Sequence, residues 1–312
     1  MGWGKTRFSD AAQAIHEQRR QEARSGQRKL EGGRRHLDLA RENARTTWKR
    51  RRWATLIFIN ALFMLSYWLD IQLLEGSLTA SRFLGFHLAD PFSALQIWLA
   101  FGHMILNLVI GTTTLVALYL IVGGRSFCSW VCPYHLLSEW GEMLHLRLAQ
   151  RGWVRDHSFR PGMRYAFMAV FLLGALLTGY TLFETISPVG LLSRALIYGP
   201  GLGLLWIALL LFVEVFYSRR AWCRYICPVG LTYRLVGAAS LFKVKYNLTH
   251  CAHDGACRQV CLVPHVLDVT RMGHAPDVDN YLSGDCTNCG MCVDLCPTGS
   301  LTFEFRWLSK LT

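Results

Sequence analysis

The chain has 312 residues, of which 52% are hydrophobic, and its formal net charge is +12. This hydrophobic fraction is higher than that of a typical soluble enzyme and indicates a membrane component. Because most of the positive charge lies at the N-terminus, it does not favour a nucleic-acid partner, and we expect none.

Residues 1–52 form a basic arm. They hold 15 Lys or Arg against 6 Asp or Glu and end in the run Lys49-Arg50-Arg51-Arg52. A basic residue near anionic headgroups contributes about 1 kcal/mol to membrane binding. We therefore expect a cytoplasmic arm, and two interpretations stay open: it lies on the membrane surface, or it is a solvated, partly helical tail.

Four apolar segments follow the arm within residues 53–240. They are residues 53–74, 102–122, 164–183 and 200–218. A helix needs about 20 apolar residues to cross a hydrocarbon core, so each segment is predicted to be a transmembrane helix. The first begins after about fifty polar residues, which argues against a cleaved signal peptide.

The loops between these segments differ in charge. Residues 75–101 and 184–199 carry one Arg each and no Lys, whereas residues 123–163 carry five Arg. Positive loops stay in the cytoplasm. We therefore expect a multi-pass protein of a bacterial inner membrane, with the N-terminus and the C-terminal domain on the cytoplasmic side.

A cysteine motif occurs twice, 95 residues apart. Its copies are Arg125-Ser-Phe-Cys128-Ser-Trp-Val-Cys132-Pro133 and Arg220-Ala-Trp-Cys223-Arg-Tyr-Ile-Cys227-Pro228. The repetition predicts two helical hairpins in parallel topology, which would bring the two motifs together. Three interpretations of these four cysteines stay open: a third metal centre, thiol–disulfide exchange, or reduced packing residues.

The C-terminal domain, residues 241–312, contains a ferredoxin-type cysteine run. Cys286, Cys289, Cys292 and Cys296 are followed by Pro297 in the pattern C-x2-C-x2-C-x3-C-P. This spacing is typical of bacterial ferredoxins, in which three cysteines bind one cluster and the fourth binds a neighbouring cluster. We predict one 4Fe–4S cluster bound by Cys286, Cys289, Cys292 and Cys261.

An upstream run keeps the same register but changes one residue. Cys251, Cys257 and Cys261 fit the pattern, and Asp254 stands where a cysteine is expected. The second cluster would then be bound by Cys251, Cys257 and Cys296. Its fourth position stays open: Asp254 binds the iron, that iron is lost and a 3Fe–4S cluster remains, or His253 or water replaces it. A surface role for Asp254 with no second cluster is the remaining alternative. Oxygen ligands hold this iron less firmly than thiolate.

These motifs resemble the NapH/MauN family of ferredoxin-type membrane proteins over about residues 53–308. The resemblance implies an α-helical membrane protein with four transmembrane helices in two parallel hairpin repeats, plus a small α+β two-cluster ferredoxin domain. It also implies a quinol dehydrogenase subunit that passes electrons from membrane quinol, with a periplasmic ferredoxin-like or cytochrome c partner, towards an oxidoreductase such as nitrate reductase. Membrane lipid is a further expected partner.

Quinol oxidation releases protons, so it needs a proton acceptor near an apolar pocket. His103, His135 and Glu214 are the candidates, because they lie in or beside the apolar segments. Two other functions stay open. One is an accessory role in the maturation of methylamine dehydrogenase, and the other is a membrane anchor with structural clusters.

Overall fold

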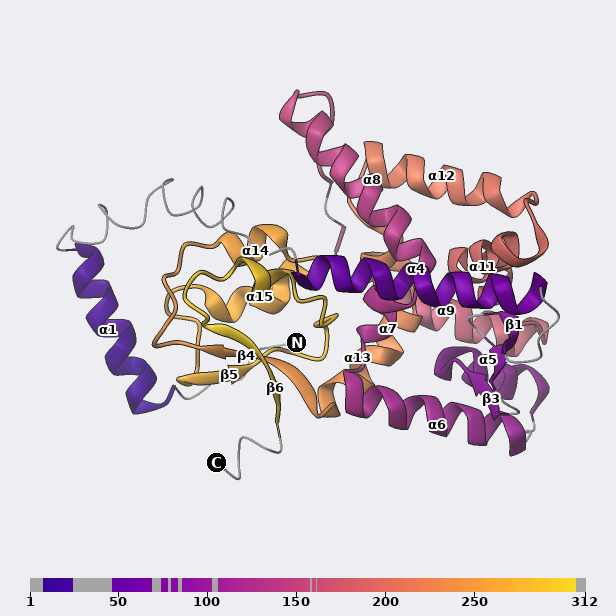
Figure 1. Cartoon of the computed structure of the whole chain (residues 1–312), viewed down its shortest axis with the longest axis horizontal. Helices are drawn as coiled ribbons and strands as arrows, with labels where there is room; N and C mark the ends of the chain where they lie inside the picture. Colours follow the sequence, from indigo (N-terminus) through magenta and orange to yellow (C-terminus); the bar gives the residue numbers. More distant parts are fainter. Residues whose placement is uncertain are drawn as a thin grey trace.

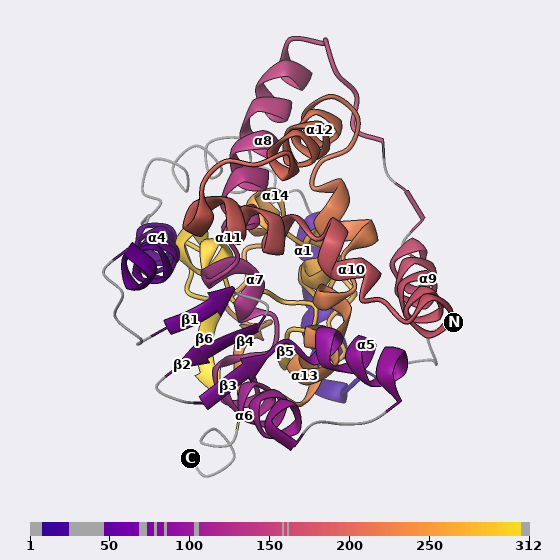
Figure 2. The same cartoon turned by 90° about the vertical axis from the view of Figure 1, so that its right-hand side faces the viewer.

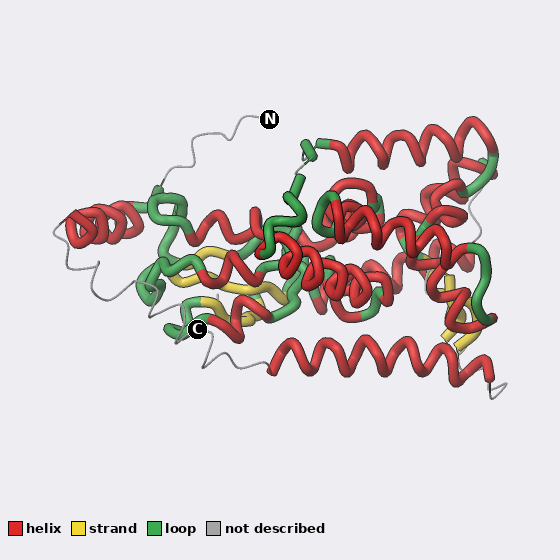
Figure 3. Tube along the Cα trace, turned by 90° about the horizontal axis from the view of Figure 1, so that it is seen from above, coloured by secondary structure: helices red, strands yellow, loops and turns green. Residues whose placement is uncertain are grey.

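The computed structural model describes residues 8–24, 47–68, 74–77, 80–83, 86–102, 106–157, 159–160 and 162–306. They form an elongated molecule with two regions at opposite ends of Figure 1. We call the described residues 47–239 the helical region and residues 242–306 the C-terminal region. Strands occur in the C-terminal region and in a small sheet at the far end of the helical region (Figure 3).

The helical region contains long helices joined by short ones. They are α4 (Thr47–Trp68), α5 (Pro91–Phe101), α6 (Leu106–Val122), α7 (Ser126–Trp130), α8 (Pro133–Gln150), α9 (Met163–Thr178), α10 (Leu182–Ile186), α11 (Pro188–Tyr198), α12 (Gly203–Phe216), the π-helical η1 (Trp222–Ile226) and α13 (Val229–Ala239). Seen end-on, α4, α6, α9 and α12 lie towards the periphery and α7 lies near the centre (Figure 2).

The prediction of four transmembrane helices is wrong. Within the part of the chain that the structure describes, no helix combines the length and the apolar character needed to cross a membrane. The helices at the predicted positions are too short: α6 has 17 residues, α9 has 16 and α12 has 14. The first residues of α4, the longest helix, belong to the basic run that ends at Arg52. A crossing takes about 20 apolar residues, which none of these supplies.

A three-stranded antiparallel sheet, which the sequence did not predict, lies between α4 and α5. It consists of β1 (Leu74–Ser77), β2 (Ala80–Phe83) and β3 (Phe86–Ala89). Helix α5 begins directly after it, where the Asp90 carboxylate accepts hydrogen bonds from the backbone N–H groups of Phe92 and Ser93. Such an N-cap satisfies donors that a helix start leaves unpaired, and it fixes Asp90 in the interior.

The C-terminal region is built on an antiparallel sheet in the order β5-β4-β6. The strands are β4 (Phe242–Asn247), β5 (Asp279–Tyr281) and β6 (Leu301–Phe305). The connections between these strands contain short helices: α14 (Ala256–Val260), the 3-10 helix η2 (Pro264–Thr270) and α15 (Met291–Leu295). Buried Val244, Tyr246 and Leu301 form its core against the cysteine loops.

Part of the basic arm packs on the C-terminal region. Helix α1 (Asp10–Arg24) buries Ala12 completely, and the Arg19 guanidinium donates to the backbone oxygen of Leu248 at 2.7 Å. The His16 ring pairs with the backbone oxygen of Ala275 at 3.0 Å. Residues 1–7 and 25–46 of the arm lie outside the described residues. The segment 10–24 is thus held by protein contacts.

Two glycines bring the regions into backbone contact. A Cβ on Gly284, two residues before Cys286, would lie 2.4 Å from the backbone oxygen of Arg234. A Cβ on Gly237 would lie 2.8 Å from the backbone oxygen of Gly284. Real Cβ atoms do not approach so closely, so only glycine lets α13 lie directly against this cysteine loop. The loop is thereby fixed on the helical region.

Candidate metal centres

The terminal cysteine run forms a compact set of thiols around the start of α15. Cys289 and Cys292 are buried, and Gly290 between them adopts a φ of 77°. Cys261 joins them from the upstream run: burial raises the pKa of its thiol, and the charges of Cys289 and Cys286 raise it further. Such mutual influence requires proximity, so Cys261 lies near Cys286 and Cys289. The sharing of one cluster by these thiols and Cys292 stays a prediction.

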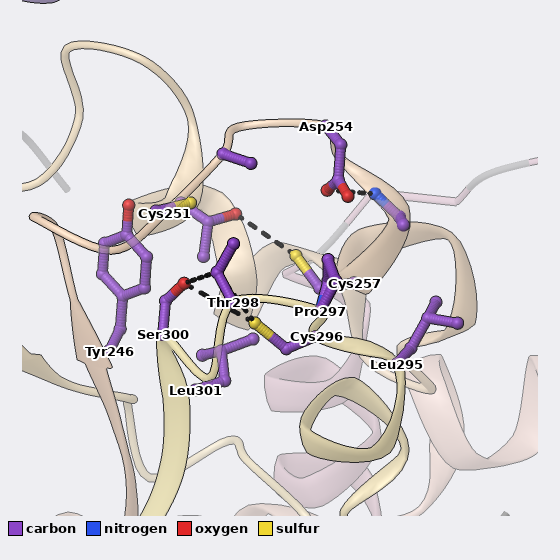
Figure 4. Close-up of a pocket in the computed structure, with 13 residues that line it drawn as sticks. Tyr246, Cys251, Asp254, Cys257, Leu295, Cys296, Pro297, Thr298, Ser300 and Leu301 are labelled. Carbon is purple, nitrogen blue, oxygen red and sulfur yellow. Dashed lines mark hydrogen bonds between the residues drawn. The ribbon is translucent and has the colours of Figure 1, made fainter. Parts of the chain in front are cut away.

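Cysteines of the upstream run border a small cavity. Cys251, Cys257, Cys296 and Asp254 all lie on its wall (Figure 4). Asp254 Oδ1 accepts a hydrogen bond from the backbone N–H of Ala256 at 3.1 Å, whereas Oδ2 is buried and has no hydrogen-bond partner. A buried carboxylate oxygen without a partner costs free energy unless a cation or donor meets it. The donor set therefore fits an iron held by three thiolates and one carboxylate.

His253 is less suited to the fourth position. Its Nδ1 pairs with the backbone oxygen of Thr270 at 2.8 Å, and the described residues that line the cavity do not include it. Its backbone has a φ of 54°, in the left-handed region that a non-glycine residue rarely adopts. This turn directs the chain so that Asp254 and not His253 borders the cavity.

The thiols of this site differ in their electrostatic environment. Burial raises the pKa of Cys257 to about 11. Burial also acts on Cys296, but hydrogen bonds from Ser300 and Thr298 outweigh it and lower the thiol pKa. Hydrogen bonds to sulfur are one of the means by which proteins set cluster potentials.

The two copies of the repeated motif have the same local geometry. The backbone N–H of Cys132 donates to the oxygen of Phe127, and that of Cys227 donates to Trp222, five residues back in each case. Both cysteines are extended, with φ and ψ of −66° and 115° for Cys132 and −63° and 111° for Cys227. The proline that follows each one begins or caps the next helix. The sequence repeat is therefore a structural repeat.

All four motif cysteines line one cavity of about 580 Å³ at the junction of the two regions. The other wall of this cavity comes from the C-terminal region, through Leu262, Val263, His265, Asp285 and Thr287. Leu262 directly follows Cys261, and Asp285 and Thr287 flank Cys286. The cavity therefore lies between the repeated motifs and the terminal cysteine run.

Helix α7, which carries Cys128, is hydrogen-bonded to the loop that carries Cys286. Ser129 Oγ donates to the backbone oxygen of Thr287 at 2.6 Å, and Trp130 Nε1 donates to that of Asn288 at 3.1 Å. Short chains of covalent and hydrogen bonds thus connect the first motif to the terminal run.

Asp285 is the electrostatic centre of this junction. Its carboxylate lies within 3.2 Å of Arg125, Arg164, Arg234 and His265, all from other segments. Burial by itself raises the pKa of Asp285, but the hydrogen bonds from His265 and Arg164 and the nearby charge of Arg125 lower it below its ordinary range. The sequence analysis missed this residue, because its partners are far away in the chain.

The three predicted proton acceptors differ in their placement. His103 lies outside the described residues. His135 is buried with Nε2 3.1 Å from Arg52 Nη1; burial and the charges of Arg220 and Arg52 lower its pKa well below the ordinary value. A ring held neutral between two guanidinium groups is a poor proton acceptor.

Glu214 and Asp90 are better suited to accept protons. Burial raises the pKa of Glu214, against a hydrogen bond from the backbone N–H of Trp222. Burial also raises the pKa of Asp90 to about 7, against a hydrogen bond from the Ser93 backbone. Groups with a pKa near the working pH are effective general bases. Asp90 was not among the predicted acceptors, since only the fold shows that it is buried.

A second groove adjoins the terminal cysteine run. It has a volume of about 360 Å³ and is lined largely by aromatic and aliphatic side chains. Trp48, Trp130, Phe242 and Phe303 are among its aromatic lining residues, and Leu118 and Tyr119 come from α6. Asn288, which stands between Cys286 and Cys289, also lines it. The groove therefore borders a predicted cluster loop.

Comparisons with known proteins agree with the cysteine geometry. A family model described as "4Fe-4S binding domain" matches residues 104–151 and 199–248, and a second with the same description matches residues 282–302. No solved structure is significantly similar to the chain.

Three relatives are similar over most of their length. Ferredoxin-type protein NapH of Escherichia coli is 33% identical over 84% of this chain and 92% of its own. Methylamine utilization ferredoxin-type protein MauN is 35% identical in Methylorubrum extorquens, over 83% of this chain and 89% of that protein. The MauN protein of Paracoccus denitrificans is also 35% identical, over 81% and 89%. The chain is therefore an iron–sulfur electron-transfer protein of the NapH/MauN ferredoxin-type family.

Proposed function

We propose that this protein takes electrons from a quinol and passes them, through two clusters in its C-terminal region, towards a periplasmic oxidoreductase. The observation that carries the proposal is the aromatic groove that Asn288 helps to line. Its volume of about 360 Å³ lies within the range of small-molecule sites, and its apolar walls with a few polar groups suit an uncharged ring.

The clusters, when bound, supply one-electron carriers. Cys286, Cys289, Cys292 and Cys261 hold the one next to the groove, and Cys251, Cys257, Cys296 and Asp254 hold the second. We assign a four-iron cluster to the first site and a four-iron or three-iron cluster to the second. The shared use of the two cysteine runs keeps the sites adjacent.

Oxidation of one quinol to a quinone releases two electrons and two protons. The electrons leave singly towards the cluster loop, and the protons require acceptors in the protein. Tyr119 on the groove wall packs edge-to-face on Tyr233, with ring centroids 5.0 Å apart, and Tyr233 lies beside Asp90. Asp90 is therefore our first choice for a proton acceptor, and Glu214 is the second.

We also propose that lipid contacts the helical region, because quinols dissolve in lipid. Large apolar side chains are exposed on several helices, including Phe58 on α4, Leu177 on α9 and Leu205 on α12. Extended exposed apolar surface is typical of interaction sites. The proposal concerns contact with lipid and includes no membrane-spanning helix.

The experiment is to fill the groove without altering the cluster loop. Leu118 lies on the groove wall and is half-exposed, so Leu118→Trp should occupy the space of a quinol ring. We expect anaerobic reduction by a soluble quinol to slow by at least about tenfold, equivalent to ~1.4 kcal/mol of lost binding. Reduction by dithionite, which needs no site, should be unchanged. The rates are followed by bleaching of the cluster absorbance.

Leu177→Trp on exposed α9 is the matched control, because it adds the same ring away from the groove. Equal quinol rates in the wild type and both variants would rule out the groove as the site. A wild type that dithionite reduces and no quinol reduces would rule out the proposed function itself.

The identity with MauN favours a second candidate. At 35% in Methylorubrum extorquens, it is slightly above the 33% identity with NapH of Escherichia coli, so a role in methylamine utilization is an alternative destination for the electrons. Gene neighbours would separate the two, since each destination requires a different oxidoreductase.

A further inference from the structure

Helix α1 brings an arginine from the N-terminal arm to the second cluster site. Ala12, His16 and Arg19 occupy one face of this helix, at spacings of four and three residues, and all three are buried. The helix packs on the core of the C-terminal region, where Ala12 belongs to the same cluster of buried side chains as Tyr246. Arg20, the next residue along the helix, is exposed. Of these two neighbouring arginines, only Arg19 is therefore enclosed by protein.

The guanidinium group of Arg19 is hydrogen-bonded to the segment that leads to Cys251. Its Nη2 donates to the backbone oxygens of Leu248, at 2.7 Å, and of Thr249, at 2.9 Å. The same oxygen of Leu248 accepts a hydrogen bond from the backbone N–H of Cys251 at 3.4 Å. A single carbonyl group thus connects Arg19 to a predicted cluster ligand.

Tyr246 lies close to both Arg19 and Cys251. It belongs to β4 and lines the cavity of the second site together with Cys251 (Figure 4). Burial raises the pKa of its phenol, the charge of Cys251 raises this pKa further, and the positive charge of Arg19 lowers it. Charges act in this way on groups a short distance away. The guanidinium, the phenol and the thiol are therefore neighbours.

Three buried polar atoms of this neighbourhood have no hydrogen-bond partner among the described residues. They are Asp254 Oδ2, Tyr246 Oη and Arg19 Nη1. Within the same part of the chain, Arg19 donates to backbone oxygens and pairs with no carboxylate. A buried charge without a partner is costly, so these groups indicate that a charged ligand belongs here. Iron supplies the cation that the carboxylate lacks, and a cluster with thiolate ligands supplies the negative charge that the guanidinium lacks.

We propose that Arg19 is a positioning residue of the second cluster site, where it stabilises the negative charge of the bound cluster and fixes the segment before Cys251. The inference rests on the proposed binding of a cluster by Cys251, Cys257, Cys296 and Asp254. Reduction adds one electron to a cluster, so a nearby buried cation favours the reduced form and raises the reduction potential. Helix α1 then contributes to electron transfer through this charge.

The test compares Arg19→Gln, Arg19→Lys and Arg20→Gln by redox titration of the full chain, purified anaerobically and without added quinol. The electron paramagnetic resonance signal that Cys257→Ala abolishes identifies the second site. We expect Arg19→Gln to lower the equilibrium constant for reduction of this site by about tenfold, a downward shift of ~59 mV for one electron. Arg19→Lys keeps the charge, and Arg20→Gln changes the exposed neighbour, so both should stay near the wild-type potential.

An unchanged potential in Arg19→Gln would overturn the proposal, and so would an equal shift in Arg19→Lys or Arg20→Gln, because the effect would then not come from the buried charge. If Arg19→Gln holds no second cluster, Arg19→Lys decides: a cluster at the wild-type potential supports the proposal, and a lost cluster or a lowered potential contradicts it. A wild type without the signal that depends on Cys257 would overturn the second cluster site and this inference with it. These outcomes do not depend on whether quinol is the donor.

Discussion

The two regions bring their cysteines together in different ways. In the C-terminal region, the connections from β4 to β5 and from β5 to β6 carry seven cysteines and Asp254, and the predicted ligands of one site are at most 45 residues apart. In the helical region, two five-residue helices, α7 and η1, each contain one cysteine and are followed by a second, in motifs 95 residues apart. The first arrangement depends on loop spacing, and the second depends on the packing of whole helices.

This difference predicts which changes each region tolerates. A loop substitution in the C-terminal region should act on one cluster. A packing change in the helical region should act on all four motif cysteines at once, since aromatic residues of the motifs form its core. Phe183 stacks on Trp222, and Phe127 stacks on Tyr233 at 5.3 Å.

The largest expected effect is at Asp285, which joins the two regions. Asp285→Ala removes the carboxylate between Arg125, Arg164 and Arg234 and leaves the buried Arg125 guanidinium without its acidic partner. Loss of one partner of a buried ion pair costs about 3–5 kcal/mol. Urea unfolding should therefore show this destabilisation.

Asp279→Asn is the control for Asp285, because Asp279 pairs with Lys245 at the surface. Its cost should stay below about 1 kcal/mol. If the two variants are equally stable, the junction does not depend on Asp285, and the regions are held together by the glycine contacts.

A smaller effect, confined to the helical region, concerns Asp90. Its pKa rises from 3.8 to about 7 in the folded protein, so the folded state keeps a proton that the unfolded state has lost. Stability should thus fall as the pH rises from about 4 to about 7. Between about pH 5.5 and pH 8, this one group accounts for about 2 kcal/mol.

Asp90→Asn should remove this pH dependence, because the amide remains neutral and still caps α5 through its oxygen. The measurement is the midpoint of urea unfolding at about pH 5.5 and at about pH 8. A pH dependence that is the same in wild type and Asp90→Asn would mean that Asp90 is ionised in the folded state.

The most localised effect is at Asp254 in the C-terminal region. An iron held by a carboxylate is released more readily than one held by thiolate, so mild oxidation should produce a three-iron electron paramagnetic resonance signal. Asp254→Cys should abolish that signal, and Asp268→Cys, at a half-exposed aspartate away from the cavity, should not. If Asp254→Cys changes neither the spectrum nor the iron content, Asp254 is not a ligand.

The sequence makes a definite prediction of the ligands of the C-terminal region, because their spacing is local, and this ligand set stays a prediction. The register that places Asp254 among three cysteines needs no tertiary information, and the cavity in Figure 4 agrees with it. The repeat also predicted correctly that the paired motifs meet.

Features that depend on long-range packing were not predictable. The Asp285 junction links residues 20 to 160 positions apart, and nothing local marks Asp285 as its centre. Hydropathy located the helices near α6, α9 and α12 but overestimated their length, because apolar residues also continue into turns such as the one at Gly179. Docking of α1 depends on contacts with Leu248 and Ala275, which a basic composition does not reveal.

The central claim is that the C-terminal region holds two adjacent iron–sulfur clusters, and the electron paramagnetic resonance spectrum of the fully reduced protein tests it most directly. We expect the wild-type spectrum to be broadened by interaction between the cluster proposed at Cys286 and the cluster proposed at Cys251 and Cys257. Cys257→Ala, which removes a thiol of the second site, should lose this broadening. Identical spectra from the two proteins would contradict the account, because no second paramagnetic centre would then lie beside the first.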